Sequence, residues 1–430
     1  MPFTFLTPFS SYLALIWQLV LLTWWAWVPV VLFFAARRVW LDYLVVRYFS
    51  KLRWIQLEVR IPREVAKPPQ AMEQIFATLH AALKFRDFYD TYWLGVQTDH
   101  FSFEVASVAG IVHFFVTIPE QYRNFVEAQI YAQYPESEVI EVSDYLDVLP
   151  ANLPNDDYNL FGTEFILARP DGYPIRTYKE FVLEGVQIKE EERKVDPIAA
   201  IVEVLGKTKT TEYISMQLLI RPVGDEWQKD GEQLMNKLLG RASVAEPTFF
   251  DTITGFFGDT LGVLFSPGGE EKSVPAKPEK EKMPGPMERK AAEAIQENIS
   301  KIGFYTVLRF LYVAKREDFT MMKFAAMNGA LRQFNTQHLN SFRPNTKAMT
   351  NAKWYNPFKN RTKFKRQKLF YQAFKARARL DARILKSKPF IFNIEELATV
   401  YHYPGVTVAA PRMQRIEAKT SAPPINLPTE

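Results

Sequence analysis

Residues 101–118, FSFEVASVAGIVHFFVTI, decide the fold class that the sequence predicts. Two strand-like runs, rich in β-branched and aromatic residues, flank Ala109-Gly110, which has the length of a two-residue hairpin turn. Two further strands and two amphipathic helices surround this hairpin, at residues 54–62, 71–83, 121–134 and 137–142. The resulting order, β-α-β-β-α-β, predicts a ferredoxin-like unit over residues 51–150, in which an antiparallel sheet carries both helices on one face.

A similar pattern recurs over residues 151–345. Three strands are expected, at Lys179–Ile188, Glu212–Arg221 and Gly303–Ala314, with helices that begin at Asp196-Pro197 and at Asp318. We therefore predict a second ferredoxin-like unit, in tandem with the first and interrupted by an insertion over residues 224–300. The alternative is one larger α+β domain with a single mixed sheet.

The insertion has parts of different character. Residues 231–241 form a predicted short helix. Residues 249–265, FFDTITGFFGDTLGVLF, are too apolar for an ordinary loop, so they either pack on the protein or contact a membrane surface or a partner. Residues 266–286 contain five Pro, four Lys and four Glu and no aromatic residue, a composition that predicts a flexible linker.

The start of the chain carries an uncharged apolar run. Residues 12–36, YLALIWQLVLLTWWAWVPVVLFFAA, are long enough as a helix, at about 1.5 Å per residue, to cross a hydrocarbon core of about 30 Å. A signal peptide would need basic residues before the run, but the first charges, Arg37, Arg38 and then Arg47, follow it. Residues 1–50 are therefore predicted to anchor a single-pass protein in the inner (cytoplasmic) membrane, with the C-terminal bulk in the cytoplasm.

Composition excludes several chemistries. The chain has no cysteine, so disulfide scaffolds, thiol nucleophiles and Cys-based metal sites are impossible, and its five histidines never approach the spacing of helical zinc ligands. Gly206-Lys207-Thr208 resembles the end of a phosphate-binding P-loop, but Ile201 stands where the first glycine is needed. The sequence predicts no cofactor, no metal site and no enzymatic activity; an unrecognised membrane-associated enzyme is the weaker hypothesis.

A basic run occupies residues 346–390. Between Lys359 and Lys388 there are twelve basic residues and one acid, Asp381, which gives this segment a charge of +11 in a chain whose net charge is +5. Aromatic residues recur there at helical intervals, which indicates an amphipathic basic helix that docks on an acidic partner face, binds anionic lipid or contacts nucleic-acid phosphates. The candidate surface consists of Lys359, Arg361, Lys363, Lys365, Arg366, Lys368, Lys375, Arg377, Arg379 and Arg383.

The C-terminal region carries a recognisable pattern. Residues 390–405, FIFNIEELATVYHYPG, then Ala410-Pro411 and PPINLP at 423–428, resemble the segment ahead of the motor domain in TraG/TraD-like coupling ATPases of the HerA/FtsK superfamily, the motors of conjugation and type IV secretion. The stretches IQLEVRIPRE, FSFEVASVAGIVHFFVTIP and FVEAQIYAQYPESEV similarly resemble the membrane-anchored region that precedes such motors.

The resemblance implies a partner. In the fused relatives the Asn-Leu-Pro segment leads into a P-loop, and this chain contains no such loop, so a separately encoded HerA/FtsK-like ATPase is the implied partner. Residues 391–430 would supply the docking segment, unless the helix at 394–401 packs on the chain's own second αβ unit. The candidate docking residues are Glu395, Glu396, Leu397, Tyr401, His402 and Pro404.

Together these patterns predict an α+β protein with one N-terminal transmembrane helix, two tandem ferredoxin-like units and a basic helical C-terminal segment. The expected function is that of a non-catalytic, membrane-anchored scaffold in a conjugation-like DNA-translocation system. The bilayer and the separate ATPase are the expected partners, with DNA and a second copy of the chain as further candidates. The alternative is a membrane-bound nucleic-acid-binding module that acts without a motor.

Overall fold

The computed structural model describes residues 7–62, 67–181, 195–240, 284–352, 357–378, 385 and 387–405. Contacts divide the chain into two units. The smaller unit contains Met1–Trp54 and Lys84–Asp99, and the larger unit contains Ile55–Leu83 and His100–Glu430.

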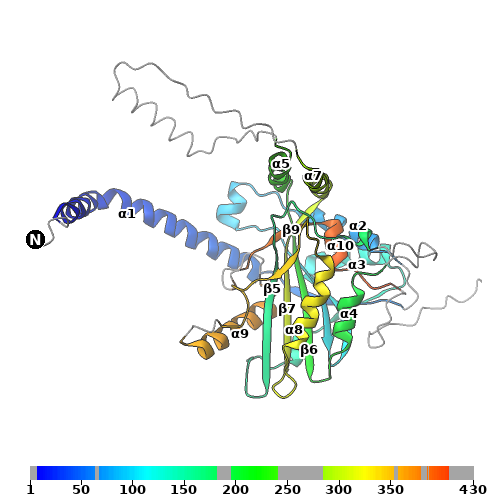
Figure 1. Ribbon diagram of the computed structural model, residues 1–430. Coiled ribbons are helices and arrows are strands. Elements are labelled where there is room, and N and C mark those ends of the chain that lie inside the picture. The colour runs from blue at the N-terminus through cyan, green and yellow to red at the C-terminus, as the bar shows by residue number, and fades with distance from the viewer. Residues whose placement is uncertain are drawn as a thin grey trace, which may run out of the picture. The chain divides into compact units, whose positions relative to one another are not determined.

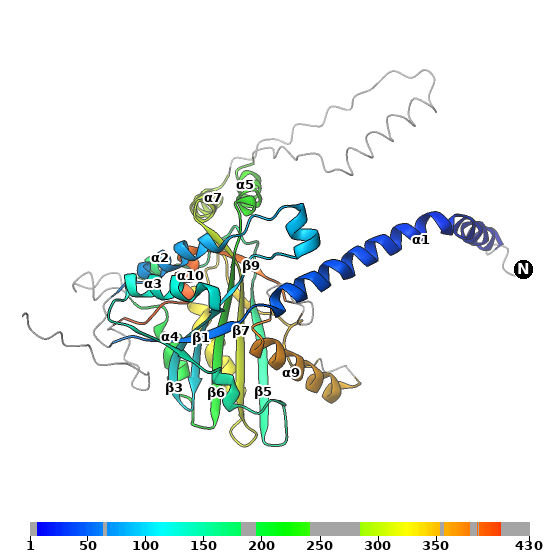
Figure 2. The same ribbon diagram turned by 180° about the vertical axis from the view of Figure 1, so that it is seen from behind.

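The larger unit is built on one sheet (Figures 1 and 2), which has nine strands among the described residues, in the order β4-β1-β3-β2-β6-β7-β5-β8 with β9 paired to β7. The strands are β1 (Trp54–Arg60), β2 (Phe101–Val108), β3 (Ile111–Pro119), β4 (Glu138–Val142), β5 (Tyr158–Leu167), β6 (Glu212–Pro222), β7 (Gly303–Lys315), β8 (Phe342–Pro344) and β9 (Phe390–Asn393). The hairpin predicted at 101–118 is present as β2 and β3, joined by Ala109 and Gly110, both at positive φ.

The prediction of two separate ferredoxin-like units is wrong. Strands β2 and β6, which would be edges of two small sheets, pair with each other in antiparallel register from Phe101↔Ile220 to Ser107↔Ile214. An edge strand leaves backbone donors and acceptors unpaired, and this pairing satisfies them along both edges at once. Counted outward from β2 and β6, the strand order is β3, β1, β4 on one side and β7, β5, β8 on the other. The repeat in the sequence is therefore a symmetry within one sheet.

Each face of the sheet carries its own core. Phe310 and Tyr312 of β7 point into a core shared with α2, α3, α4, α8 and α10, whereas the intervening Leu311 and Val313 pack with α9 on the opposite face. Helices α5 and α7 pack together in a smaller cluster around Ile295. The α-helices of the larger unit are α2 (Gln70–Leu79), α3 (Arg123–Gln133), α4 (Ala199–Gly206), α5 (Glu226–Leu238), α7 (Pro286–Ile299), α8 (Met322–Leu331), α9 (Lys359–Lys375) and α10 (Ile394–Val400). Short helical turns are η1 (His80–Ala82), η3 (Glu120–Tyr122), η4 (Tyr145–Val148), η5 (Tyr178–Glu180) and η6 (Arg332–Phe334).

The smaller unit consists of helix α1 (Thr7–Ser50) and the segment 84–99, which contains a π-helical turn, η2 (Asp90–Leu94). Helix α1 continues without a break through Arg37 and Arg38 to Ser50. Among the described residues, no helix combines the length and the apolar character that crossing a membrane requires. The transmembrane helix predicted at 12–36 is therefore wrong, and the orientation drawn from Arg37, Arg38 and Arg47 loses the helix on which it was based.

Some predicted features lie outside the described residues. They are most of the strand expected at Lys179–Ile188, the apolar segment 249–265, almost all of the linker 266–286, Arg379 and Arg383 of the basic run, and the tail from 406 onward. The described start of that expected strand, residues 179–181, is not a strand, because Lys179 and Glu180 belong to the short helix η5.

Candidate functional site

Helix α9, which contains much of the basic run, packs one side against the sheet. Phe370 and Phe374, one turn apart, are fully buried against the sheet face that contains Leu311. Gly162 of β5 permits this close packing, because a Cβ there would lie 2.3 Å from the ring of Phe370. The Gln367 side chain donates hydrogen bonds to the Leu160 carbonyl (2.5 Å) and to Asn159 Oδ1 (3.1 Å). One side of α9 is therefore fixed to β5.

The other side of α9 presents positive charge to solvent. Arg361, Lys365 and Lys368 are exposed, and Lys363 is half-buried. Within the part of the chain that the structure describes, none of these side chains forms an ion pair. Arg361, Lys365 and Lys368 recur at intervals of four and three residues and so share one helix face, whereas Lys363 lies nearer the side of the buried Gln367 and Phe370. Uncompensated cations on one face create a positive potential that attracts polyanions.

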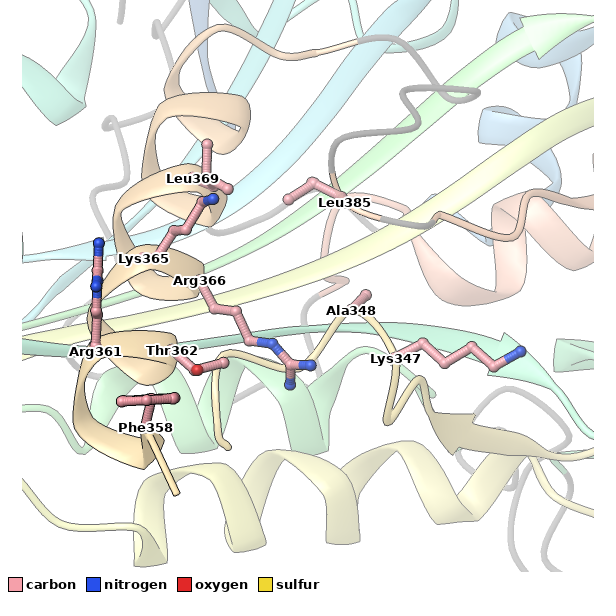
Figure 3. A pocket seen from close by; sticks show the side chains of 9 residues that line it. All are labelled: Lys347, Ala348, Phe358, Arg361, Thr362, Lys365, Arg366, Leu369 and Leu385. Atoms are coloured by element: carbon pink, nitrogen blue, oxygen red, sulfur yellow. The ribbon is translucent and has the colours of Figure 1, made fainter. Parts of the chain in front are cut away.

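A cleft with a volume of about 620 Å³ opens along this basic side of α9 (Figure 3). Arg366 extends from the helix toward the segment that carries Lys347 and Ala348, and its Nη1 donates to the Asn351 carbonyl at 2.7 Å. The residues that line the cleft are Lys347, Ala348, Phe358, Arg361, Thr362, Lys365, Arg366, Leu369 and Leu385. Four of them are basic and none is acidic, so the cleft favours a phosphate-bearing or other anionic group beside apolar surface.

The C-terminal end of the basic run does not share this surface. Lys375 pairs with Asp147 at 2.7 Å. Arg377, only 6% exposed, pairs with Glu104 (Nε to Oε1, 2.9 Å) and with Asp144. The prediction that Arg377 belongs to a nucleic-acid or lipid surface is wrong, because two carboxylates hold its guanidinium inside the protein. Burial opposes the ionisation of Glu104, but the charge and hydrogen bonds of Arg377 outweigh it and hold the pKa of Glu104 below its ordinary value.

Arg377 belongs to a buried polar row that the sequence analysis did not identify. Glu104, Gln217, Arg309 and Glu164 lie in register across β2, β6, β7 and β5. Arg309 Nε pairs with Glu164 at 3.0 Å, and Gln217 Nε2 donates to Glu104 at 3.2 Å. Glu104, Gln217 and Arg309 each have an apolar residue on both sides in their strands, and a polar residue within such an apolar run is the signal that the sequence offered.

The polar row fixes the chain that follows α9. Arg309 Nη1 donates to the Ala378 carbonyl at 2.9 Å, and the Ser387 hydroxyl donates to Glu164 at 2.6 Å. Gln217 also donates to the Phe374 carbonyl at 3.3 Å. The backbone of α9 and its exposed basic side are therefore positioned by charges buried in the centre of the sheet.

The predicted docking segment is part of the protein's own core. Strand β9 pairs with β7, and α10 begins with a capping box in which Asn393 and Glu396 bond each other's backbone N–H groups. The prediction of a partner-docking surface here is wrong, because these side chains fill the protein's own core. The alternative placed this helix on the second αβ unit, whereas α10 packs mainly on α2, which lies in the region predicted as the first unit. The buried residues are Glu395, Glu396, Leu397, Tyr401, His402 and Pro404.

The charged members of that segment have internal partners. Glu395 pairs with Lys301 (2.5 Å) and Lys179 (2.6 Å), and His402 Nε2 lies 2.7 Å from Asp196. Burial raises the pKa of Glu396 to about 8, and the nearby carboxylates of Asp171 and Glu395 add to the rise. In the described ranges, His, Asp and Glu side chains form no group of three or more that could hold a metal ion.

The sequence was compared with known protein families and with curated proteins. A family profile described as "Domain of unknown function (DUF8128)" matches residues 50–415. The chain belongs to the DUF8128 family. The matched region includes the whole sheet, α9 and α10, whereas nearly all of α1 precedes it. The comparison with curated proteins finds no match.

Proposed function

We propose that this DUF8128 protein is a non-catalytic component of a conjugation-like DNA-translocation system, and that it binds DNA through the exposed basic side of α9. In this proposal a separately encoded HerA/FtsK-like ATPase supplies the motor. The resemblance of segments within residues 55–139 and 390–428 to TraG/TraD-like coupling proteins supports the system, and the basic cleft beside α9 supports the contact with DNA.

The observation that carries the proposal is that the basic side chains on the exposed side of α9 form no ion pairs within the described residues. Arg361, Lys363, Lys365 and Lys368 have no acidic partner within the described chain, although acids nearly balance bases over the whole sequence, at 48 against 53. Natural proteins usually intersperse charges of both signs on their surfaces. An uncompensated basic helix face held on a rigid sheet is suited to follow a row of phosphates.

A location at the inner membrane is part of the same proposal. Helix α1 exposes apolar side chains on consecutive positions, including all of residues 30–34. Exposed apolar side chains of this kind favour contact with the surface layer of a membrane, which requires no helix that crosses it.

One observation favours a second function, a nucleic-acid-binding module that acts without a motor. The residues for which motor docking was predicted, among them Glu396 and Tyr401, are buried in the core, so the surface that the resemblance implied is not exposed. A motor would have to bind elsewhere on the protein. Co-purification of a HerA/FtsK-like ATPase encoded beside this gene supports the first function, and its failure to bind the full chain favours the second.

DNA binding is tested by salt dependence. The variant with Arg361→Gln and Lys365→Gln removes two exposed cations that line the cleft, and the matched control carries Arg289→Gln and Lys290→Gln on the exposed side of α7. If both cleft cations contact duplex phosphates, the slope of log K against log salt decreases by about 2 in the first variant and is unchanged in the control. Equal slopes in the wild-type chain and both variants would exclude DNA binding by α9.

A further inference from the structure

The smaller unit carries a cluster of exposed aromatic side chains that DNA binding does not use. Within ten residues, Phe85 is 91% exposed, Phe88 68%, and Tyr89 and Trp93 57% each, and Leu94 is also exposed. We call this set the aromatic cluster. Most large apolar side chains of the sheet are buried. Several large apolar side chains that are exposed next to one another therefore indicate a binding surface.

The aromatic cluster is held rigidly on α1. Gly95, at φ +66°, lies against α1 so closely that a Cβ there would be 2.7 Å from the Cβ of Leu44. The indole of Trp40 donates to the Tyr92 carbonyl at 2.8 Å, and Arg37 donates to the Tyr92 hydroxyl at 2.5 Å.

The other end of the segment is also fixed. Asp99 accepts hydrogen bonds from Lys84 (2.7 Å) and from the hydroxyl of Tyr48 on α1 (3.0 Å). Among the exposed rings, Tyr89 and Trp93 stack at 6.2 Å between centroids. The exposed rings are therefore presented on a fixed support.

We infer that the aromatic cluster, with the neighbouring arginines of α1, binds the headgroup layer of an anionic membrane. Tyr and Trp rings, which have an apolar body and a polar edge, are enriched at this layer. Arg37, which bonds the Tyr92 hydroxyl, and the exposed Arg38, the next residue of α1, supply cations. Basic residues near an anionic leaflet contribute about 1 kcal/mol each. The smaller unit as a whole has seven basic residues against four acidic ones.

Lipid fits this surface better than a protein partner does, because the surface continues along α1. Beside the aromatic cluster, the exposed apolar side chains of α1 include Val39, Tyr43 and Val46, which recur at intervals of four and three residues and so form one apolar stripe. A helix that lies in the headgroup layer buries such a stripe. The inference rests on the membrane location in the proposed function and concerns the surface layer of a membrane, so it requires no helix that crosses it.

The absence of cysteine in the chain makes a direct test possible. In the full-length protein, Phe85→Cys is labelled with a polarity-sensitive fluorophore, and Val148→Cys, at a 66% exposed apolar position of the larger unit, serves as the matched control. Vesicles of phosphatidylglycerol and vesicles of phosphatidylcholine alone are then added. We expect the emission at position 85 to shift to the blue with phosphatidylglycerol vesicles, and the emission at position 148 to stay unchanged.

Each contrary result overturns the inference. No shift at position 85 shows that the aromatic cluster does not enter lipid. An equal shift with both kinds of vesicle removes the role of the arginines. A shift that appears without vesicles and grows with protein concentration assigns the cluster to a second copy of the chain. Flotation of the same samples distinguishes failure of this inference from failure of the proposed membrane location. A protein that floats with the vesicles but shows no emission shift at position 85 binds the membrane through another surface. DNA binding, measured separately, depends on α9.

Discussion

Arg361 and Arg377 belong to the same basic run, yet they lie in opposite environments. Arg361 is exposed on α9 beside a cleft without acids, whereas Arg377 is buried and paired with Glu104 and Asp144. The first leaves its positive charge at the surface, and the second ties the end of the helix that carries the first to the buried Glu104. A count of charges along a sequence therefore mixes surface cations with buried ones.

The same division separates the two segments that the sequence marked for partners. The basic run keeps an exposed, uncompensated side, whereas the segment 394–404 is enclosed by the protein's own core. A capping box and a strand pairing with β7 account for the second segment. Of these two segments, only the basic run keeps exposed side chains in the part of the chain that the structure describes.

We expect the largest difference in stability between the variants Arg377→Ala and Arg361→Ala. Loss of Arg377 leaves the buried Glu104 without its counter-charge, and breaking a buried ion pair in this way costs about 3–5 kcal/mol of the free energy of unfolding. Loss of the exposed Arg361 changes it by less than about 0.5 kcal/mol. Urea unfolding of the two variants measures both values. Equal stabilities would show that Arg377 does not position α9.

The second test concerns Glu396 in the buried segment. Its pKa, raised to about 8 by burial, exceeds the ordinary value of 4.5, so the stabilising contribution of the protonated carboxyl is complete below pH 4.5 and is lost as the pH rises toward 8. Within that window the free energy of unfolding falls by at most about 1.4 kcal/mol per pH unit from this group. Glu396→Gln keeps a residue suited to the capping box and removes this slope.

Urea unfolding between pH 5 and pH 8 measures the slope in the wild-type chain and in Glu396→Gln. Part of the pH dependence remains in the variant, since burial also raises the pKa of Asp171, to about 6. The control, Glu293→Gln on the exposed side of α7, retains the wild-type slope. A Glu396→Gln variant with that same slope would mean that Glu396 is ionised in the folded protein at neutral pH.

Local elements of the fold were predictable because their signals are local. The hairpin at 101–118 and the helices found as α2, α3, α4 and α8 follow from periodicity over ten to fifteen residues. The pairing of β2 with β6 was not predictable in this way. It pairs Phe101 with Ile220, more than a hundred residues apart, and the residues of neither strand specify which strand it pairs with. The sequence therefore suggested two sheets where the structure has one.

The candidate site was predictable in composition but not in arrangement. The sequence showed a basic helix with aromatic residues, and the structure has α9 there, with Phe370 and Phe374 buried. It did not show which cations remain free, because Glu104 and Asp144, which hold Arg377, come from residues far away in the chain. The resemblance likewise implied a docking surface at residues 395–404, although the charged side chains there have partners within the chain, such as Lys301 and Asp196.

The smallest expected effect comes from Lys375, which lies between the two environments. Its ammonium pairs with Asp147 at 2.7 Å, and the two side chains are 33% and 59% exposed. A surface ion pair of this kind contributes about 0–1 kcal/mol, so Lys375→Gln changes the free energy of unfolding by no more than that. Because Asp147 already compensates the charge, DNA affinity and its salt slope stay at the wild-type values in filter-binding titrations. If Lys375→Gln decreased the slope of log K against log salt as much as the variant with Arg361→Gln and Lys365→Gln does, the DNA contact would extend to the end of α9. An ion-paired cation would then contribute to DNA binding as the unpaired ones do.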